Sequence, residues 1–186
     1  MIIKTRKELK HFLECDKKNL RMTKRRPKLI GKDVANEIWK YEILLRKYEY
    51  HLNNNHKIRS LVLKVLLNKK GITLGIDIPA NVFSSGLAII HCGGIVVSPK
   101  CKIGSNCMLY QNVTIGEEKS CAPVIGDNVC ILPGAKVFGN IKIGSNVMVG
   151  ANSVVNKDVP NNARVVGVPA KTINYNGNEY SIEETL

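Results

Sequence analysis

Aliphatic residues recur at every sixth position through most of the C-terminal two thirds of this chain. A spacing of six is too long for a helical period but is a multiple of the strand period of two, so each hexad fits one short strand and one corner. Three hexads close a triangular coil of about 18 residues, and successive coils stack on one another. The sequence therefore predicts a mainly β fold, a single-stranded parallel β-helix. The repeating residues are Val97, Ile103, Leu109, Ile115, Ile125, Ile131, Val137, Ile143, Val149 and Val155.

Other positions follow the same period. Most positions two residues before the repeating aliphatics hold a small or aliphatic residue, so we expect Cys101 and Cys107 to be core thiols. Gly, Asn and Asp recur at the corners, where Gly and Asn tolerate a positive φ. Ile115 and Ile125 stand ten residues apart instead of six, so Glu117–Pro123 should leave the coil as a loop. Such a loop is either part of a binding face or a neutral insertion.

The N-terminal part differs in charge and in period. Residues 1–72 hold 20 of the 28 Lys and Arg and 7 of the 15 Asp and Glu, which leaves residues 73–186 with eight of each. Helical spacing predicts a short helix over Arg6–Asn19, a second that includes Ile38–Leu52, and a third that includes Leu61–Leu66 and ends at Gly71. We therefore predict a basic α-helical arm (1–72), a β-helix (73–173) and a C-terminal tail (174–186). Lys24–Lys28 is expected to be a basic connector within the arm.

Several classes of protein are disfavoured by composition. No apolar run approaches the roughly 20 residues that a membrane-spanning helix needs. The N-terminus lacks the apolar core of a signal peptide, so we expect a cytoplasmic protein. None of the six cysteines forms a Cys-x-x-Cys pair, and we expect free thiols and no metal. A neutral body with 5% aromatic residues argues against nucleic-acid binding. The basic arm is either a solvated helical face or a peripheral contact with anionic membrane lipids.

His91 is the candidate catalytic residue. It is the only histidine of the β-helix and stands six residues before Val97, where the repeat asks for an aliphatic residue. Gly93 and Gly94 follow and leave open backbone for a ligand. An imidazole, with an ordinary pKa near 6.5, suits a general base at about pH 7. We interpret His91 as a general base, with a structural histidine as the alternative.

Two segments of the chain resemble a known family. They are residues 75–116, GIDIPANVFSSGLAIIHCGGIVVSPKCKIGSNCMLYQNVTIG, and residues 150–173, GANSVVNKDVPNNARVVGVPAKTI. They are similar to the serine acetyltransferase branch of the hexapeptide acyltransferases, especially its polysaccharide-associated members. The resemblance implies a left-handed β-helix and a homotrimer that binds acetyl-CoA in grooves between neighbouring subunits. It also implies acetyl transfer to a hydroxyl, with His91 as general base.

The resemblance also suggests roles for other residues. Asp77 matches the aspartate that orients the base, although its Ile-Asp-Ile-Pro segment lacks the family's histidine, and Ile90 replaces a second aspartate. The residues that would line the acetyl-CoA groove are Pro133, Gly134, Ala151, Asn156, Lys157 and Lys171, the two lysines facing phosphates. The alternative for each of these six is an ordinary corner residue or a solvated lysine.

The loop departs most from the family. Cys121-Ala122-Pro123 stands where serine acetyltransferases carry Arg-His-Pro, so no guanidinium or imidazole is available to hold an amino acid. We therefore expect a sugar hydroxyl as acceptor, in surface polysaccharide biosynthesis. The alternatives are a serine O-acetyltransferase of cysteine biosynthesis and a non-catalytic β-helix scaffold. A carbonic anhydrase of β-helical type needs three histidines around zinc, and one histidine is too few.

Overall fold

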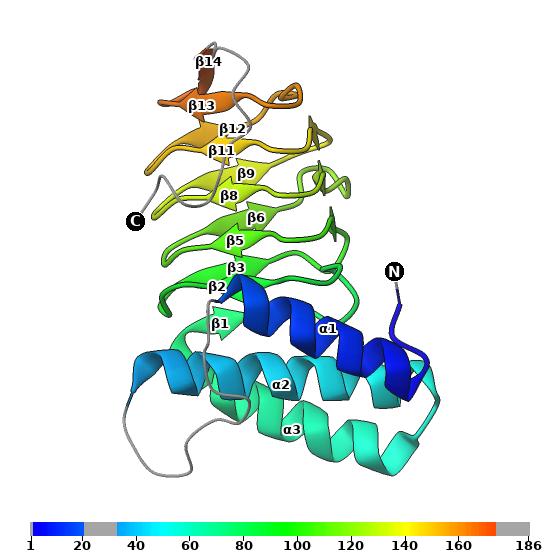
Figure 1. Cartoon of the computed structure of the whole chain (residues 1–186). Helices are drawn as coiled ribbons and strands as arrows, with labels where there is room; N and C mark the ends of the chain where they lie inside the picture. Colours follow the sequence, from blue (N-terminus) through cyan, green and yellow to red (C-terminus); the bar gives the residue numbers. More distant parts are fainter. Residues whose placement is uncertain (1, 21–32, 174–186) are drawn as a thin grey trace.

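The computed structural model describes residues 2–20 and 33–173 and consists of a triangular prism of stacked coils with three helices packed at its N-terminal end (Figure 1). The predicted connector at Lys24–Lys28 and the predicted tail at 174–186 lie outside these residues. The parallel strands form three faces. The first face contains β1 (Ile76–Asp77), β3 (Ile95–Val97), β6 (Thr114–Gly116), β9 (Lys136–Phe138) and β12 (Val154–Val155). The second contains β4 (Lys102–Ile103), β7 (Val124–Ile125) and β10 (Lys142–Ile143). The third contains β2 (Ala88–Ile89), β5 (Met108–Leu109), β8 (Cys130–Ile131), β11 (Met148–Val149) and β13 (Arg164–Val166), which β14 (Lys171–Ile173) joins antiparallel.

The register of the strands confirms the predicted coil length. Val96 pairs with Thr114, and Lys136 pairs with Val154, so the partners in each pair stand three hexads apart in the chain. All ten repeating aliphatic residues are buried inside the prism, and so are Cys101 and Cys107. The core is therefore a set of stacked aliphatic layers, and it stabilises the fold mainly by removing apolar surface from water.

The corner residues have two distinct roles. Most corner asparagines carry the positive φ that was predicted, and the side chains of four of them form a hydrogen-bonded ladder from Asn106 to Asn162 through Asn128 and Asn146. Gly104 has no positive φ, and proximity explains its identity: a Cβ there would lie 2.5 Å from the carbonyl oxygen of Gly126 in the next coil. The expectation that corner glycines serve for positive φ is thus wrong at Gly104, where close stacking excludes a side chain.

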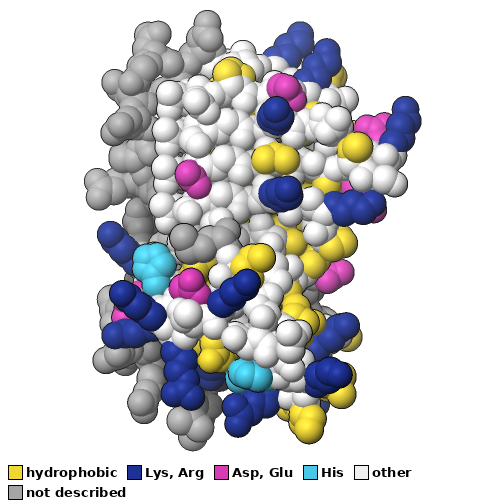
Figure 2. Space-filling model, turned by 90° about the vertical axis from the view of Figure 1, so that its right-hand side faces the viewer, with side chains coloured by type: hydrophobic (Ala, Val, Ile, Leu, Met, Phe, Trp, Pro, Cys, Tyr) yellow, Lys and Arg dark blue, Asp and Glu magenta, His cyan; other side chains and the backbone are white. Residues whose placement is uncertain are grey.

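The three helices are α1 (Arg6–Asn19), α2 (Val34–Asn53) and α3 (Lys57–Leu74). The bounds predicted for α1 are confirmed, and Thr5 and Glu8 form a capping box at its start. The prediction that Gly71 ends the third helix is wrong, because α3 continues to Leu74 and Gly75 ends it in the left-handed conformation. Lys and Arg side chains gather around this helical end of the molecule (Figure 2).

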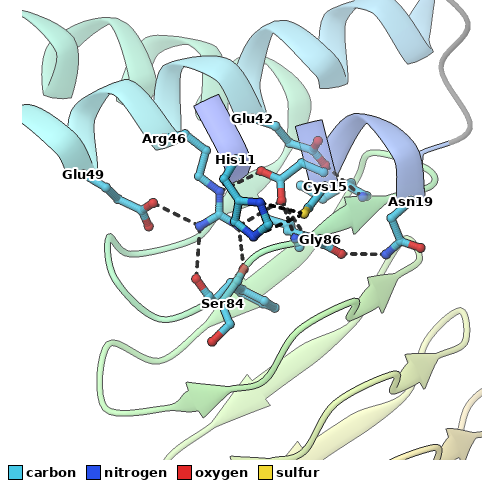
Figure 3. Close-up of polar contacts among 12 residues, drawn as sticks. His11, Cys15, Asn19, Glu42, Arg46, Glu49, Ser84 and Gly86 are labelled. Carbon is cyan, nitrogen blue, oxygen red and sulfur yellow. Dashed lines mark hydrogen bonds and ion pairs between the residues drawn. The ribbon is translucent and has the colours of Figure 1, made fainter. Parts of the chain in front are cut away.

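A buried charged cluster joins the helices to the first coil (Figure 3). The guanidinium of Arg46 donates to both oxygens of Asp16, at 2.7 and 3.2 Å, to Glu49 Oε2 at 3.0 Å, and to the carbonyl oxygens of Phe83 and Ser84. We call Asp16, Glu42, Arg46 and Glu49 the Arg46 cluster. All four are fully buried or nearly so.

The Arg46 cluster solves a problem that every β-helix has at its first coil. Half of the backbone groups of that coil bond to the second coil, and the others have no coil beneath them. The acidic side chains of the cluster accept four of these N–H groups: Asp16 from Gly86 and Leu87, Glu49 from Asn81, and Glu42 from Ile89. The helices therefore act as a polar cap on the open end of the prism.

Candidate active site

His91 lies on the corner that joins β2 to β3. The expectation that it replaces an inward aliphatic residue is wrong, since Ile89 fills that position and pairs with Leu109. The physical reason is a local insertion. Cys130 pairs with Met148, three hexads later, whereas Ala88 pairs with Met108, which stands two residues farther along than three hexads. The two extra residues widen this corner and place His91 on the outside of the prism, where it is exposed.

The surroundings of the His91 ring suit a group that exchanges protons with a ligand. The ring lies 6.0 Å from the ring of Tyr110, between centroids, and is otherwise open. A Cβ on Gly93 would meet nothing within 4 Å, so free space lies beside the corner there, as predicted. The prediction is wrong at Gly94, where a Cβ would collide with the side chain of Asn112 in the next coil. Among the described residues, no side chain hydrogen-bonds the ring. Both nitrogens of His91 therefore remain available to a substrate.

The corners of successive coils stack above His91 along one edge of the prism. The N–H of Asn112 donates to Gly93 O at 2.7 Å, and the N–H of Gly134 donates to Gln111 O at 3.0 Å. The N–H of Asn152 in turn donates to Pro133 O at 2.8 Å. We call the residues 90–94, 110–112, 132–134 and 150–152 the His91 edge. Three of the predicted cofactor residues, Pro133, Gly134 and Ala151, belong to the His91 edge.

The other predicted cofactor residues lie elsewhere. Asn156 and Lys157 follow β12, on the edge that separates the first face from the second, and Lys171 is exposed in β14 beyond the last coil. The loop Glu117–Pro123 follows β6 and lies on the same edge as Asn156. We call this edge, between the first and second faces, the loop edge. The first face separates the two edges, so within one chain the structure does not bring these residues to His91.

The loop itself has the predicted form. Glu118 and Cys121 exchange two backbone hydrogen bonds of 2.8 and 2.9 Å, and Lys119 and Ser120 between them both have positive φ. Such a pair makes a tight two-residue turn. An ion pair of 3.0 Å from Lys100 to Glu117 ties the base of the loop to the preceding coil. The loop therefore projects from the coil as a small hairpin with Lys119 at its tip.

Asp77 lies on the first face, in β1, and is exposed between the buried Ile76 and Ile78. The predicted pair of Asp77 with His91 is not formed in the single chain, because no hydrogen bond joins them. Asp77 instead lines a groove of about 520 Å³ between α3 and the first face, which Ile72, Gly94 and Val96 also line. The groove reaches the corner glycine beside His91, so a ligand there would lie close to the His91 edge.

Two features of the site were not foreseen from the sequence. Lys136 donates from Nζ to the carbonyl oxygen of Asn112, at 2.6 Å, and to Thr114 Oγ1, at 3.1 Å, and so places a cation beside the His91 edge. Its outward position in the hexad was the signal that could have found it. The second feature is Glu42, which accepts from Ile89, two residues before His91, and anchors that corner to α2. Within residues 2–20 and 33–173, no group of three or more His, Cys, Asp or Glu could hold a metal ion.

Comparison with known proteins identifies the repeat. Residues 122–157 match the bacterial transferase hexapeptide family (six repeats). A serine acetyltransferase of Staphylococcus aureus is 47% identical over 108 residues, which cover 55% of this chain and 51% of that protein. A serine acetyltransferase of Staphylococcus epidermidis is 45% identical over the same length. The chain thus spans about half the length of the curated relatives it matches.

Solved structures match over almost the whole chain. The serine acetyltransferase of Neisseria gonorrhoeae aligns with a TM-score of 0.70 and 31% identity, over 91% of this chain and 68% of that one. A serine acetyltransferase in complex with CoA aligns with a TM-score of 0.70 and 30% identity, over 90% and 71%. The match confirms the left-handed β-helix with its N-terminal helical region. The chain belongs to the hexapeptide-repeat acyltransferases, in their serine acetyltransferase-like branch.

Proposed function

We propose that this protein is an acetyl-CoA-dependent O-acetyltransferase in which His91 is the general base. The observation that carries the proposal is the widened corner, which sets an exposed imidazole beside the free space at Gly93. A ring nitrogen of His91 accepts the proton of an acceptor hydroxyl while its oxygen attacks the thioester carbonyl. The C–O bond forms, the C–S bond breaks, and the proton passes to the departing CoA thiolate. The similarity to a solved complex with CoA supports acetyl-CoA as the donor.

The separation of the two edges supports a homotrimer. One prism holds His91 on one edge and the loop Glu117–Pro123 on another. Packing three prisms side by side would set the loop edge of one subunit against the His91 edge of its neighbour. The groove between them would be lined by Pro133, Gly134 and Ala151 from one edge and by Asn156 and Lys157 from the other. Lys157 and Lys171 supply cations for the phosphates of CoA.

Serine is the acceptor that the comparisons favour. The relatives named above are serine acetyltransferases, and one solved neighbour from Neisseria gonorrhoeae contains serine. A sugar hydroxyl is the second candidate, and the loop is the observation that favours it. Cys121, Ala122 and Pro123 offer no side-chain cation for a substrate carboxylate, and Lys119 is the only cation within the loop. An acceptor without a carboxylate would need none.

An acceptor screen that measures CoA thiol release tests these proposals. We expect CoA thiol release with L-serine. If the loop Glu117–Pro123 determines which acceptor binds, we expect release with a hexose or a nucleotide sugar instead. If neither L-serine nor any sugar gives thiol release, the result would favour the non-catalytic scaffold. His91→Ala should lower turnover by about 10²- to 10⁴-fold, and Asp77→Asn should lower it less. His51→Ala, which changes a histidine of α2, is the matched control, and full activity of His91→Ala would refute the proposed base.

A further inference from the structure

Helix α3 is apolar on the side that faces away from the protein. Its inner side, with Leu67 and Gly71, packs against the rest of the chain and is buried. Ile72, near the C-terminal end of the helix, is 84% exposed. Before it, five large side chains on the outer side are between 46% and 82% exposed, and they are Ile58, Leu61, Val62, Val65 and Leu66. Their spacing of three and four residues places them in one continuous stripe. We call these five residues the outer stripe of α3.

Positive charge borders the outer stripe. Helical periodicity places Lys57 and Lys64 along one flank and Arg59 and Lys70 along the other, with Lys69 within the stripe. Lys57–Leu74 contains no acidic residue. Lys70 pairs with Glu37, whereas the other four cations have no acidic partner in the described part of the chain. The surface is therefore both apolar and strongly basic.

The place of α3 in the fold leaves the outer stripe open. The coils rise on one side of α2, and α3 lies on the other, at the end of the molecule farthest from β13 (Figure 1). In the view of Figure 2, hydrophobic side chains lie among the Lys and Arg side chains at this end. Within the described residues, no helix combines the length and the hydropathy that a membrane crossing needs. The exposed side of α3 combines apolar side chains with cations and carries no acidic residue, and such a surface can lie in the plane of a membrane surface.

We infer that the outer stripe of α3 docks the protein on an anionic lipid surface. The apolar side chains would enter the boundary between headgroups and acyl chains, while the flanking cations would neutralise lipid phosphates. A second copy is a less suitable occupant, since pairing α3 with α3 would set two rows of unpaired cations against each other. The inference does not rest on the proposed acetyl transfer. It would place the N-terminal end of the prism, with the nearby His91 corner, next to the membrane.

Flotation with lipid vesicles tests the inference. We expect the whole protein to float with vesicles of phosphatidylglycerol and phosphatidylcholine but not with phosphatidylcholine alone, and to dissociate as salt rises. The double variant Leu61→Gln/Val65→Gln should lower the partition coefficient about tenfold or more. Lys57→Gln/Lys64→Gln should lower the partition coefficient about 25-fold, since each cation contributes about a factor of five. Lys102→Gln/Lys142→Gln, on the second face, and Val124→Gln, which changes an exposed valine of β7, are the controls.

The outcomes separate the two occupants. Light scattering of the Leu61→Gln/Val65→Gln variant should give the same oligomeric mass as the unchanged protein, with the same circular dichroism spectrum. Loss of oligomer mass in that variant would show that a second copy covers the stripe and would overturn the inference. Failure of the unchanged protein to float with anionic vesicles at low salt would overturn it as well.

Discussion

Replacing Arg46 with Met tests whether the Arg46 cluster holds the first coil in place. The guanidinium makes five hydrogen bonds, three to Asp16 and Glu49 and two to the carbonyl oxygens of Phe83 and Ser84. Removing one partner of a buried ion pair costs about 3–5 kcal/mol, and each orphaned carbonyl costs about 1 kcal/mol more. We therefore expect a loss of about 5–7 kcal/mol, which is a large part of a stability of about 5–15 kcal/mol.

The loss should appear directly in thermal unfolding. A change of about 1 kcal/mol shifts the Tm of a domain of this size by about 2–4 °C, so Arg46→Met should lower Tm by about 10–28 °C. Far-ultraviolet circular dichroism follows the transition, with both proteins at the same protomer concentration because assembly would also affect stability. Lys47→Met is the matched control, since Lys47 is the next residue of α2 and is exposed.

A conservative variant shows whether Arg46 stabilises the protein through the geometry of its guanidinium or through its charge. Arg46→Lys keeps the positive charge but cannot reproduce the forked donors that reach two carboxylates and two carbonyls at once. We expect it to fall between the unchanged protein and Arg46→Met. If the melting curve of Arg46→Met coincides with that of Lys47→Met, the cluster contributes little, and the reasoning about a polar cap is refuted.

Two further variants test the coil stacking and the buried acid. Gly104→Ala should lower Tm clearly in a thermal melt, because its Cβ would lie 2.5 Å from Gly126 O, whereas Gly116→Ala has room and should be neutral; equal melts would contradict this. Burial, followed by the charge of Asp16, raises the pKa of Glu42 well above its ordinary range. The protonated Glu42 side chain therefore stabilises the folded state at low pH, and this stabilisation is lost as the pH rises above about 4.3, the ordinary pKa of Glu. In urea unfolding, the free energy of unfolding of Glu42→Gln should therefore rise relative to that of the unchanged protein between pH 5 and pH 7.5. If the two free energies change by the same amount between these pH values, the raised pKa of Glu42 is refuted.

The repeat made the β-helix predictable because each hexad contains the residues that determine its own strand and corner. An inward aliphatic residue and a corner residue recur locally, and stacking only repeats them, so the sequence alone predicts the buried series and the loop. The Arg46 cluster was not predictable in this way. Apart from the bond of Arg46 to Glu49, its bonds join residues 30 to 71 positions apart, such as Arg46 to Asp16 and Asp16 to Leu87. Charged residues in a helix also ordinarily indicate a solvated face.

The sequence named candidate site residues but not their arrangement in space. His91 stands at a break in the pattern, but the pattern alone could not tell a substituted core position from an inserted corner. Only the pairing of Ile89 with Leu109 resolves this, since a shift of two residues preserves the inward and outward alternation of a strand. Likewise, the sequence does not reveal that five of the six predicted cofactor residues lie on two different edges of the prism and the sixth, Lys171, in β14 beyond the last coil.

Both candidate elements of the site occur where a coil is longer than three hexads. The coil from Ala88 to Met108 is longer by two residues at His91, and the coil from Thr114 to Lys136 is longer by four at the loop. Regular coils leave only strands and tight corners, which present little beyond backbone and short side chains to a ligand. An insertion releases side chains from that packing while the coils above and below keep its base rigid. Deleting Cys92 and Gly93 together should therefore restore a coil of three hexads that still stacks, with an unchanged circular dichroism spectrum, but that no longer supports thiol release from acetyl-CoA. Activity that survives this deletion would show that the widened corner is not needed.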